Sequence, residues 1–191
     1  MKELQYMPLD QLMTLGSPVP IARWGEPVLH RPCAQVTDFG PDLWNLLCTM
    51  FATNTAASGA GLAAPQIGVD LAVFVFDCED AFGRRRQGLV CNPAITLAAD
   101  PFEETDLEGC LSYPGAAVPL ARPDFAICRG QDQFGEPITV AGTGTLARCL
   151  QHETDHLGGV VMADHLTTEQ QRALQREHKL NAPRYPMSWP A

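Results

Sequence analysis

The chain has 191 residues, of which 46% are hydrophobic and 18% charged, and this composition is typical of a single globular domain with a substantial core. Its net charge of −9 argues against a protein that binds nucleic acid without regard to sequence, because such a protein needs a basic surface. No apolar run approaches the roughly 20 residues that span a bilayer. We therefore expect neither a membrane nor a specific nucleic acid among its partners.

Cysteine usage bears on the cellular compartment. The chain has seven cysteines, an odd number without a CxxC pair, which indicates reduced thiols rather than a disulfide framework. The stretch from Met1 to Tyr6 lacks the apolar run of a secretory signal. Both observations predict a cytoplasmic location, where most of these thiols would be small core residues and one could be a metal ligand.

The first third of the chain predicts little regular structure before one long helix. Residues 1–20 form a predicted N-terminal extension with a short helix near Leu9–Leu15, and residues 21–36 read as an irregular segment. Apolar residues then recur at helical spacing, which predicts a helix over 41–56 with Asp38 as a candidate N-terminal cap.

A glycine-rich segment, GAGLAAPQIG, follows at 59–68. It lacks the Lys and Ser/Thr of a P-loop, which argues against a phosphate cradle. Glycines also let a backbone approach a ligand closely and pair with an extended peptide. Gln66 has a side-chain amide that can donate to an oxygen. On these residues alone, an ordinary loop and a ligand-binding loop are equally open.

Short strands are predicted in the middle of the chain. We expect them at 71–76, within 88–97 around an interruption at Asn92-Pro93, and as a hairpin at 125–130 and 137–141. A last periodic segment predicts a helix over 167–180 that begins at a threonine cap.

The motif QHETDH at 151–156 carries the strongest chemical signal. On a helix, His152 and His156 lie on one face about one turn apart, where two imidazoles can bind a single metal ion. Glu153 beside them can act as a general base. The alternative is a core helix whose histidines happen to have this spacing.

Several short strands followed by this helix indicate an α+β fold. We expect antiparallel β-strands packed around a central metal-binding helix that carries the HExxH pattern of residues 152–156.

A catalytic metal site needs a third protein ligand, and the segment EGCLS at 108–112 offers one. A thiolate is a strong, soft ligand for Zn²⁺ or Fe²⁺. Cys110 stands out among the cysteines because it lies beside a glycine and near polar residues rather than in an apolar run.

Three segments, in their order and spacing, resemble the signature motifs of peptide deformylase: GAGLAAPQ at 59–66, EGCLS at 108–112 and QHETDH at 151–156. The resemblance runs from about Ile21 to Leu180. It predicts a deformylase domain at 21–180, between the N-terminal extension and a C-terminal tail at 181–191.

The resemblance implies a role for each residue that matches the motifs. Cys110, His152 and His156 would hold the metal. Glu153 would be the catalytic acid and base.

The remaining matched residues would support the substrate and the ligands. Gln66 and the backbone N–H of Leu111 would stabilise the oxyanion. The backbone of Gly61 would pair with the peptide. Glu108 and Asp155 would not bind the metal but would orient the groups that do.

The resemblance implies a metallohydrolase that removes the N-formyl group from the N-terminal formylmethionine of newly synthesised proteins and releases formate. Its partners would be N-formylmethionyl nascent peptides, with a transient ribosome contact left open. One divalent ion is expected, Fe²⁺ in first place, with Zn²⁺ or Ni²⁺ able to substitute. Tyr113 replaces a small aliphatic residue of the common pattern, and Ala117 stands where some bacterial members carry an arginine, so peptide preference is open.

Two alternative functions fit parts of the sequence. A zinc endopeptidase shares HExxH, but Met162 stands where one large class has its third histidine. Another class uses a downstream glutamate, and Glu169 or Glu177 could serve only if its helix folded onto the site. The second alternative is a homologue that binds metal or peptide without turnover, although every group that the mechanism requires is present.

An ion pair is predicted between two segments far apart in sequence. Asp155 lies on a helix that we expect to be buried, and an unpaired buried charge would cost several kcal/mol. Arg122 is the first arginine after Cys110, and the resemblance implies an arginine about ten residues after EGCLS. The planar fork of an arginine suits a carboxylate. We predict that Arg122 pairs with Asp155 and fixes the Cys110 segment to the metal helix. The alternative is a solvated Arg122 and an Asp155 satisfied by backbone donors.

Overall fold

The computed structural model describes residues 7–191, so the first six residues of the predicted N-terminal extension lie outside the described part. The strands are β1 (Gly61–Ala63), β2 (Val73–Glu79), β3 (Arg85–Thr96), β4 (Glu103–Gly109), β5 (Ala117–Pro123), β6 (Phe125–Gln131) and β7 (Pro137–Thr143). The α-helices are α1 (Leu9–Leu12), α2 (Pro41–Ala56), α3 (Gly144–Leu157) and α4 (Thr168–Asn181). Short 3₁₀ helices are η1 (Pro27–His30), η2 (Ala64–Ile67), η3 (Met162–His165) and η4 (Ala182–Arg184).

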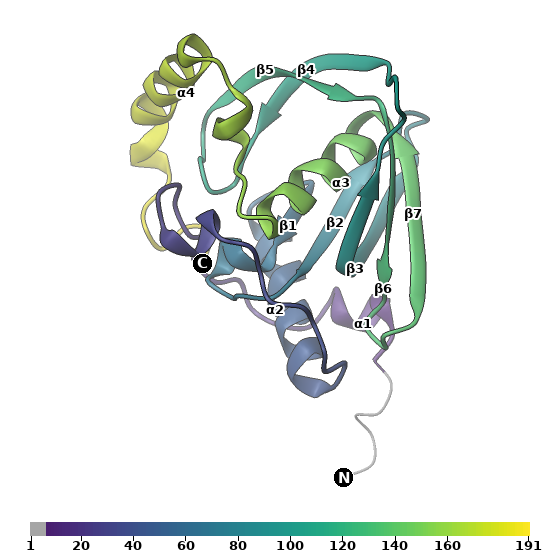
Figure 1. Ribbon diagram of the computed structural model, residues 1–191. Helices are drawn as coiled ribbons and strands as arrows, with labels where there is room; N and C mark the ends of the chain where they lie inside the picture. Colours follow the sequence, from purple (N-terminus) through teal and green to yellow (C-terminus); the bar gives the residue numbers. More distant parts are fainter. Residues whose placement is uncertain (1–6) are drawn as a thin grey trace.

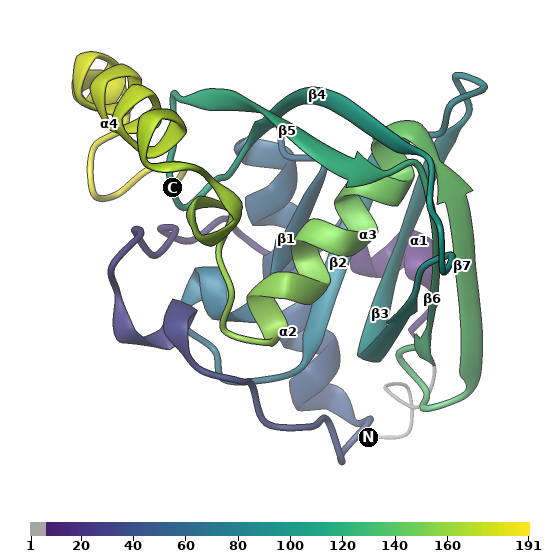
Figure 2. The same ribbon diagram turned by 45° about the horizontal axis from the view of Figure 1, so that its top comes forward.

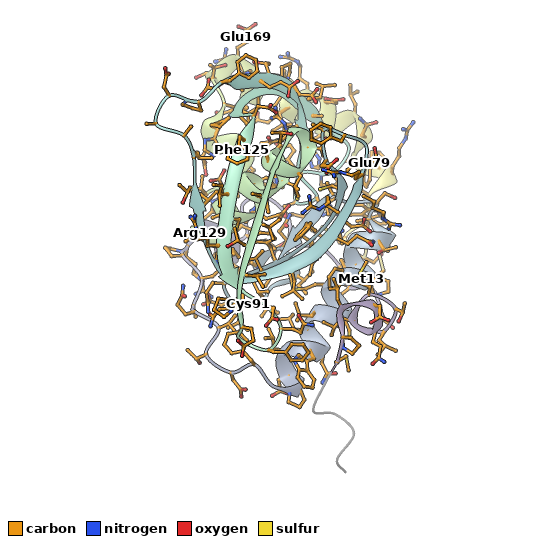
Figure 3. The ribbon with its side chains drawn as sticks, turned by 90° about the vertical axis from the view of Figure 1, so that its right-hand side faces the viewer. Met13, Glu79, Cys91, Phe125, Arg129 and Glu169 are labelled. Carbon is orange, nitrogen blue, oxygen red and sulfur yellow. The ribbon has the colours of Figure 1, made fainter. Side chains whose placement is uncertain are left out.

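The strands form two antiparallel sheets. The larger has the order β1-β2-β3-β6-β7, and β4 pairs with β5 in the smaller. The predicted α+β fold with antiparallel pairing is confirmed. Figure 3 looks onto the β7 side of the larger sheet, where Phe125 and Arg129 mark the course of β6.

Strand β2 of the larger sheet is buried on both faces over residues 73–76. Val73 and Val75 of β2 belong to the core cluster that includes α2, whereas Phe74 and Phe76 pack with residues of α3. Successive side chains of a strand point to opposite faces, so a strand covered on both sides has an unbroken apolar sequence. At β2 the sheet therefore lies between α2 and α3.

Helix α3 occupies the middle of the molecule, between the larger sheet and the β4–β5 pair (Figures 1 and 2). The smaller sheet is joined to it by side chains of α3 that donate to strand carbonyls. Gln151 Nε2 donates to Pro123 O at 2.9 Å, and Arg148 Nη1 donates to Leu120 O at 2.9 Å. The segment QHETDH thus lies within a helix that is covered from two sides.

The predicted helices have close counterparts in the structure. The helix expected over 41–56 has those bounds as α2, and α4 begins after Thr167, whose Oγ1 accepts from the backbone N–H of Gln170 at 3.3 Å. The predicted Asp38 cap is wrong, because the N-cap is Gly40 and no side chain caps α2. Pro41 at the first helical position has no N–H, so one fewer backbone donor needs a partner there.

The predicted strands also have counterparts, with shifted ends. In β3 the pairing register with β6 shifts between Cys91 and Ala94, as the Asn92-Pro93 interruption requires. The expected hairpin is β6–β7. Strands β1, β4 and β5 were not predicted.

The segments on either side of the predicted domain pack against it. Leu12 of α1 is fully buried against α2, and Ile21 N donates to Trp189 O at 3.1 Å near the C-terminus. The division into 1–20, 21–180 and 181–191 stays a prediction. All seven cysteines are free thiols, as predicted. Among the described residues no helix is both long and apolar enough to cross a membrane.

Candidate active site

Cys110, His152 and His156 converge on one point. Their ligand atoms all lie within 4.8 Å of one another, and Cys110 Sγ is 3.3 Å from His156 Nε2. The three residues are at most 8% exposed. One thiolate and two imidazoles form a donor set that suits Zn²⁺ or Fe²⁺, so these residues form a possible metal-binding group.

Local structure explains how these side chains meet. His152 and His156 lie one turn apart on α3, and their ring centroids are 4.9 Å apart. Strand β4 ends at Gly109, and the next residue, Cys110, lies buried beside the same helix. A turn in which Tyr113 N donates to Cys110 O at 2.8 Å then reverses the chain toward β5.

Behind these residues, the buried carboxylate of Glu108 accepts four hydrogen bonds. Its Oε1 accepts from His152 Nδ1 and Arg122 Nη2, each at 2.8 Å, and its Oε2 accepts from Arg122 Nε at 3.0 Å and Arg148 Nη1 at 2.9 Å. Burial opposes ionisation, but the bonds from His152 and Arg122 hold the pKa of Glu108 well below its usual range. An ionised carboxylate only accepts, so Nδ1 of His152 carries the hydrogen and Nε2 is the ring nitrogen left for a metal.

The pKa values of His152 and His156 shift in opposite directions. Burial and the neighbouring His152 lower the pKa of His156 well below its ordinary value, which keeps that imidazole neutral. Burial also opposes protonation of His152, yet its hydrogen bonds to Cys110 and Glu108 raise its pKa well above the ordinary value. Glu108 thus favours a positive charge at His152, whereas His156 stays neutral.

The predicted ion pair between Arg122 and Asp155 is present, with Nη1 to Oδ2 at 2.7 Å. However, Nε and Nη2 of Arg122 both donate to Glu108, and it is the other terminal nitrogen, Nη1, that donates to Asp155. Asp155 Oδ2 also lies 2.9 Å from His165 Nε2. Arg122 therefore joins the segment before Cys110 to the helix that carries the histidines.

Glu153 lies next to His152 and is 4% exposed. Burial raises the pKa of Glu153 to about 7, His152 opposes this rise and the charge of Glu108 adds to it. A carboxyl whose pKa is near neutral can both accept and return a proton. Within the described residues Glu153 Oε2 has no hydrogen-bond partner, so it is available to a bound molecule.

Gly61 allows the edge strand β1 to approach α3 closely. A Cβ at Gly61 would lie 2.7 Å from both Cys149 Sγ and Glu153 Oε1, so any side chain here would displace the glutamate. Within the described part of the chain, β1 pairs with β2 on one side only. Its other edge can receive an extended peptide.

Gln66 is oriented by its own loop. Ala63 N donates to Gln66 Oε1 at 2.8 Å, which turns the amide nitrogen toward Cys110 Sγ at 3.7 Å and Ser112 Oγ at 3.3 Å. The amide can therefore donate to an oxygen bound beside Cys110.

A cavity of about 350 Å³ joins these groups. Its lining includes Gly61, Gln66, Cys110, Leu111, His152 and Glu153. The volume falls in the range of pockets that hold small ligands. His156 and Asp155 are not among the residues that line it.

Sequence comparison identifies the family. A profile described as polypeptide deformylase matches residues 18–172. Peptide deformylase 1 of Streptomyces avermitilis is 53% identical over 174 residues, which are 90% of this chain and 81% of that protein. The chain belongs to the polypeptide deformylase family. A peptide deformylase of Acidothermus cellulolyticus is 44% identical over 157 residues, 82% of this chain and 83% of that protein.

Solved structures of the family have the same fold. A peptide deformylase from Legionella pneumophila is 34% identical with a TM-score of 0.78, and the match covers 87% of this chain and 96% of that chain. A peptide deformylase from Synechococcus elongatus in complex with actinonin is 33% identical with a TM-score of 0.75, over 85% of this chain and 87% of that chain.

Sequence reasoning missed Arg148, which lines the cavity and binds Glu108. It lies four residues before His152 on α3, so the helical period already placed a cation on the face of the histidines. It also missed Tyr185 and Trp189, which line the cavity from the C-terminal segment. No local pattern in the sequence marks those two residues.

Replacement of Arg122 by alanine should destabilise the protein. The change leaves the buried carboxylate of Glu108 with fewer partners and removes the link to Asp155, which should lower the free energy of unfolding by about 3–5 kcal/mol and weaken metal retention. Urea unfolding and metal content would be measured on the same preparations.

Arg129→Ala is the matched control, because Arg129 is exposed on β6 and its side chain makes one long hydrogen bond, to Thr96 Oγ1 at 3.4 Å. Its stability should change by no more than about 0.5 kcal/mol. Equal effects of the two substitutions would contradict the assigned role of Arg122.

Proposed function

We propose that this protein is a metal-dependent hydrolase that removes the formyl group from the N-terminal formylmethionine of newly synthesised proteins and releases formate. The observation that carries the proposal is the convergence of Cys110, His152 and His156 beside Glu153, in a chain of the polypeptide deformylase family. Cys110, His152 and Glu153 line a cavity that is also lined by the amide donor Gln66 and by Gly61 of β1.

Cys110, His152 and His156 would hold one divalent metal ion. The fit rests on the donor set, whose ligand atoms lie close together, and on its burial. When bound there, such an ion lowers the pKa of a water molecule and polarises a carbonyl oxygen. We propose Fe²⁺, the ion that the resemblance to peptide deformylase implies, with Zn²⁺ or Ni²⁺ as substitutes, since a site with one thiolate accepts all three.

Glu153 would move the proton in the reaction. It accepts a proton from the water molecule that attacks the formyl carbon, and it returns this proton to the methionine nitrogen as the C–N bond breaks. Water and the formamide thus become formate and a free amine. A pKa near 7 suits both halves of this task.

Two donors would meet the negative charge that develops on the formyl oxygen. Gln66 Nε2 is already turned toward Cys110 by the bond that its oxygen receives from Ala63. The backbone N–H of Leu111, next to Cys110, is the second. Such a donor typically contributes about 2.7–4 kcal/mol to the transition state.

The peptide part of the substrate would pair with the open edge of β1 at Gly61. The partners would then be formylmethionyl nascent peptides. We propose a cytoplasmic location on the same grounds, and a transient contact with the ribosome stays open. Residues 21–180 would form the deformylase domain.

One assay distinguishes the proposed deformylase from the two alternative functions. Incubation with formyl-Met-Ala-Ser should release formate and leave internal peptide bonds intact. Cleavage of internal bonds would instead support a zinc endopeptidase. Binding of metal and peptide without formate release would support a homologue that has lost turnover.

Substitution of Glu153 by alanine should leave metal content unchanged, because Glu153 is not a proposed ligand. Formate release should fall about 10²–10⁴-fold, since the variant has no group to handle the proton. Both quantities would be measured on one preparation. Activity close to that of the wild type would show that another group is the base.

Iron-loaded enzyme should lose activity in air, because an Fe²⁺–thiolate centre is open to oxidation. Nickel-loaded enzyme should keep its activity under the same conditions. Equal decay of the iron and nickel forms in aerobic buffer would argue that iron oxidation is not the cause of the loss of activity.

Replacement of Cys110 by aspartate should shift metal preference toward harder ions and sharply reduce deformylation.

A further inference from the structure

The C-terminal segment Tyr185–Trp189 is fastened to the domain beside the active site. Arg23 Nη2 donates to Pro186 O at 2.7 Å and to Tyr185 O at 3.2 Å, and Ile21 N donates to Trp189 O at 3.1 Å. The guanidinium of Arg23 also lies 5.6 Å from the centroid of the Trp189 ring. Figures 1 and 2 show the chain after α4 returning alongside the segment that contains η1.

The loop after Cys110 holds the same segment from the other side. Gly115 has φ +76°, and a Cβ there would lie 2.6 Å from Tyr185 Cε2, so the ring rests directly on this glycine. Asn181 Nδ2, at the end of α4, donates to Gly115 O at 2.7 Å. The position of Tyr185 is thus coupled to the loop that follows the proposed ligand.

Tyr185 and Trp189 line the cavity that contains His152 and Glu153. Their ring centroids are 5.1 Å apart with the planes at 90°, an edge-to-face pair. Both rings are half-buried, whereas His152 and Glu153 are almost fully buried. The aromatic pair therefore lies at the rim of the cavity and the reactive groups lie at its base.

We infer that Tyr185 and Trp189 bind the substrate residues that follow the formylmethionine and so determine how strongly longer peptides bind. This inference rests on the proposed function. A formyl group that reaches Glu153 at the base leaves the next residues of the peptide at the rim. Aromatic rings there offer apolar contact to an apolar or aromatic side chain of the peptide.

The test compares a short and a long substrate. Formate release would be measured with formyl-Met amide and with formyl-Met-Ala-Phe, for wild type and for Tyr185→Ala and Trp189→Ala. The wild type should prefer the tripeptide. In each variant the ratio of kcat/KM for the tripeptide over that for formyl-Met amide should fall about tenfold, through KM rather than kcat.

Two further variants distinguish the loss of a contact with the peptide from a general loss of stability in the C-terminal segment. Met187→Ala lies in the same segment, but Met187 is 70% exposed and is not among the residues that line the cavity, so its ratio should equal that of the wild type. Trp189→Phe keeps an aromatic ring and should recover most of the preference.

The possible outcomes are distinct. Equal losses on both substrates, or an unchanged ratio in the alanine variants, would overturn the role of Tyr185 and Trp189. A wild-type enzyme that releases no formate from either substrate would instead defeat the proposed function.

Discussion

The carboxylate of Glu108 connects the parts of the site, because three side chains from two separate elements donate to it. Arg122 comes from β5, whereas Arg148 and His152 come from α3. An unpaired carboxylate at this depth would cost several kcal/mol, so the smaller sheet and the helix are constrained to lie where all four bonds can form. The same constraint sets which nitrogen of His152 faces Cys110. The electrostatics of Glu108 thus determine the geometry of the proposed metal ligands.

Close packing on the opposite side of α3 completes the arrangement. Phe74 and Phe76 of β2 hold the helix against the larger sheet, and Gly61 leaves just enough room for Glu153. The helix is therefore fixed by apolar contacts on one side and by ion pairs on the other. This combination keeps Glu153 buried beside the proposed metal site, with its Oε2 unbonded among the described residues and its pKa near neutral.

Local patterns in the sequence predicted the main helices and much of the candidate site. Helices α2, α3 and α4 have clear periodicity, and the spacing of His152 and His156 requires only that α3 be helical. The pairing of Arg122 with Asp155 was predicted from a carboxylate on a helix expected to be buried and from the arginine that the resemblance implies, although the Asp155 side chain is 27% exposed. Strand β4 could not be predicted in this way, because its sequence is polar and six of its seven residues are exposed. In the described part of the chain it pairs only with β5. The docking of Trp189 depends on Arg23 and Ile21, which are far away in the chain and carry no signal of the contact.

The affinity of the Glu108→Gln variant for Ni²⁺, measured by competition with a chelator, tests most directly whether this carboxylate holds the metal site together. Glutamine keeps the shape of the side chain and removes its charge, so His152 loses a strong acceptor and the two arginines lose their counter-charge. Affinity should fall about 10–100-fold, while Glu104→Gln, an exposed change on the same strand, should bind Ni²⁺ like the wild type. An unchanged affinity in Glu108→Gln would contradict the central place given to Glu108.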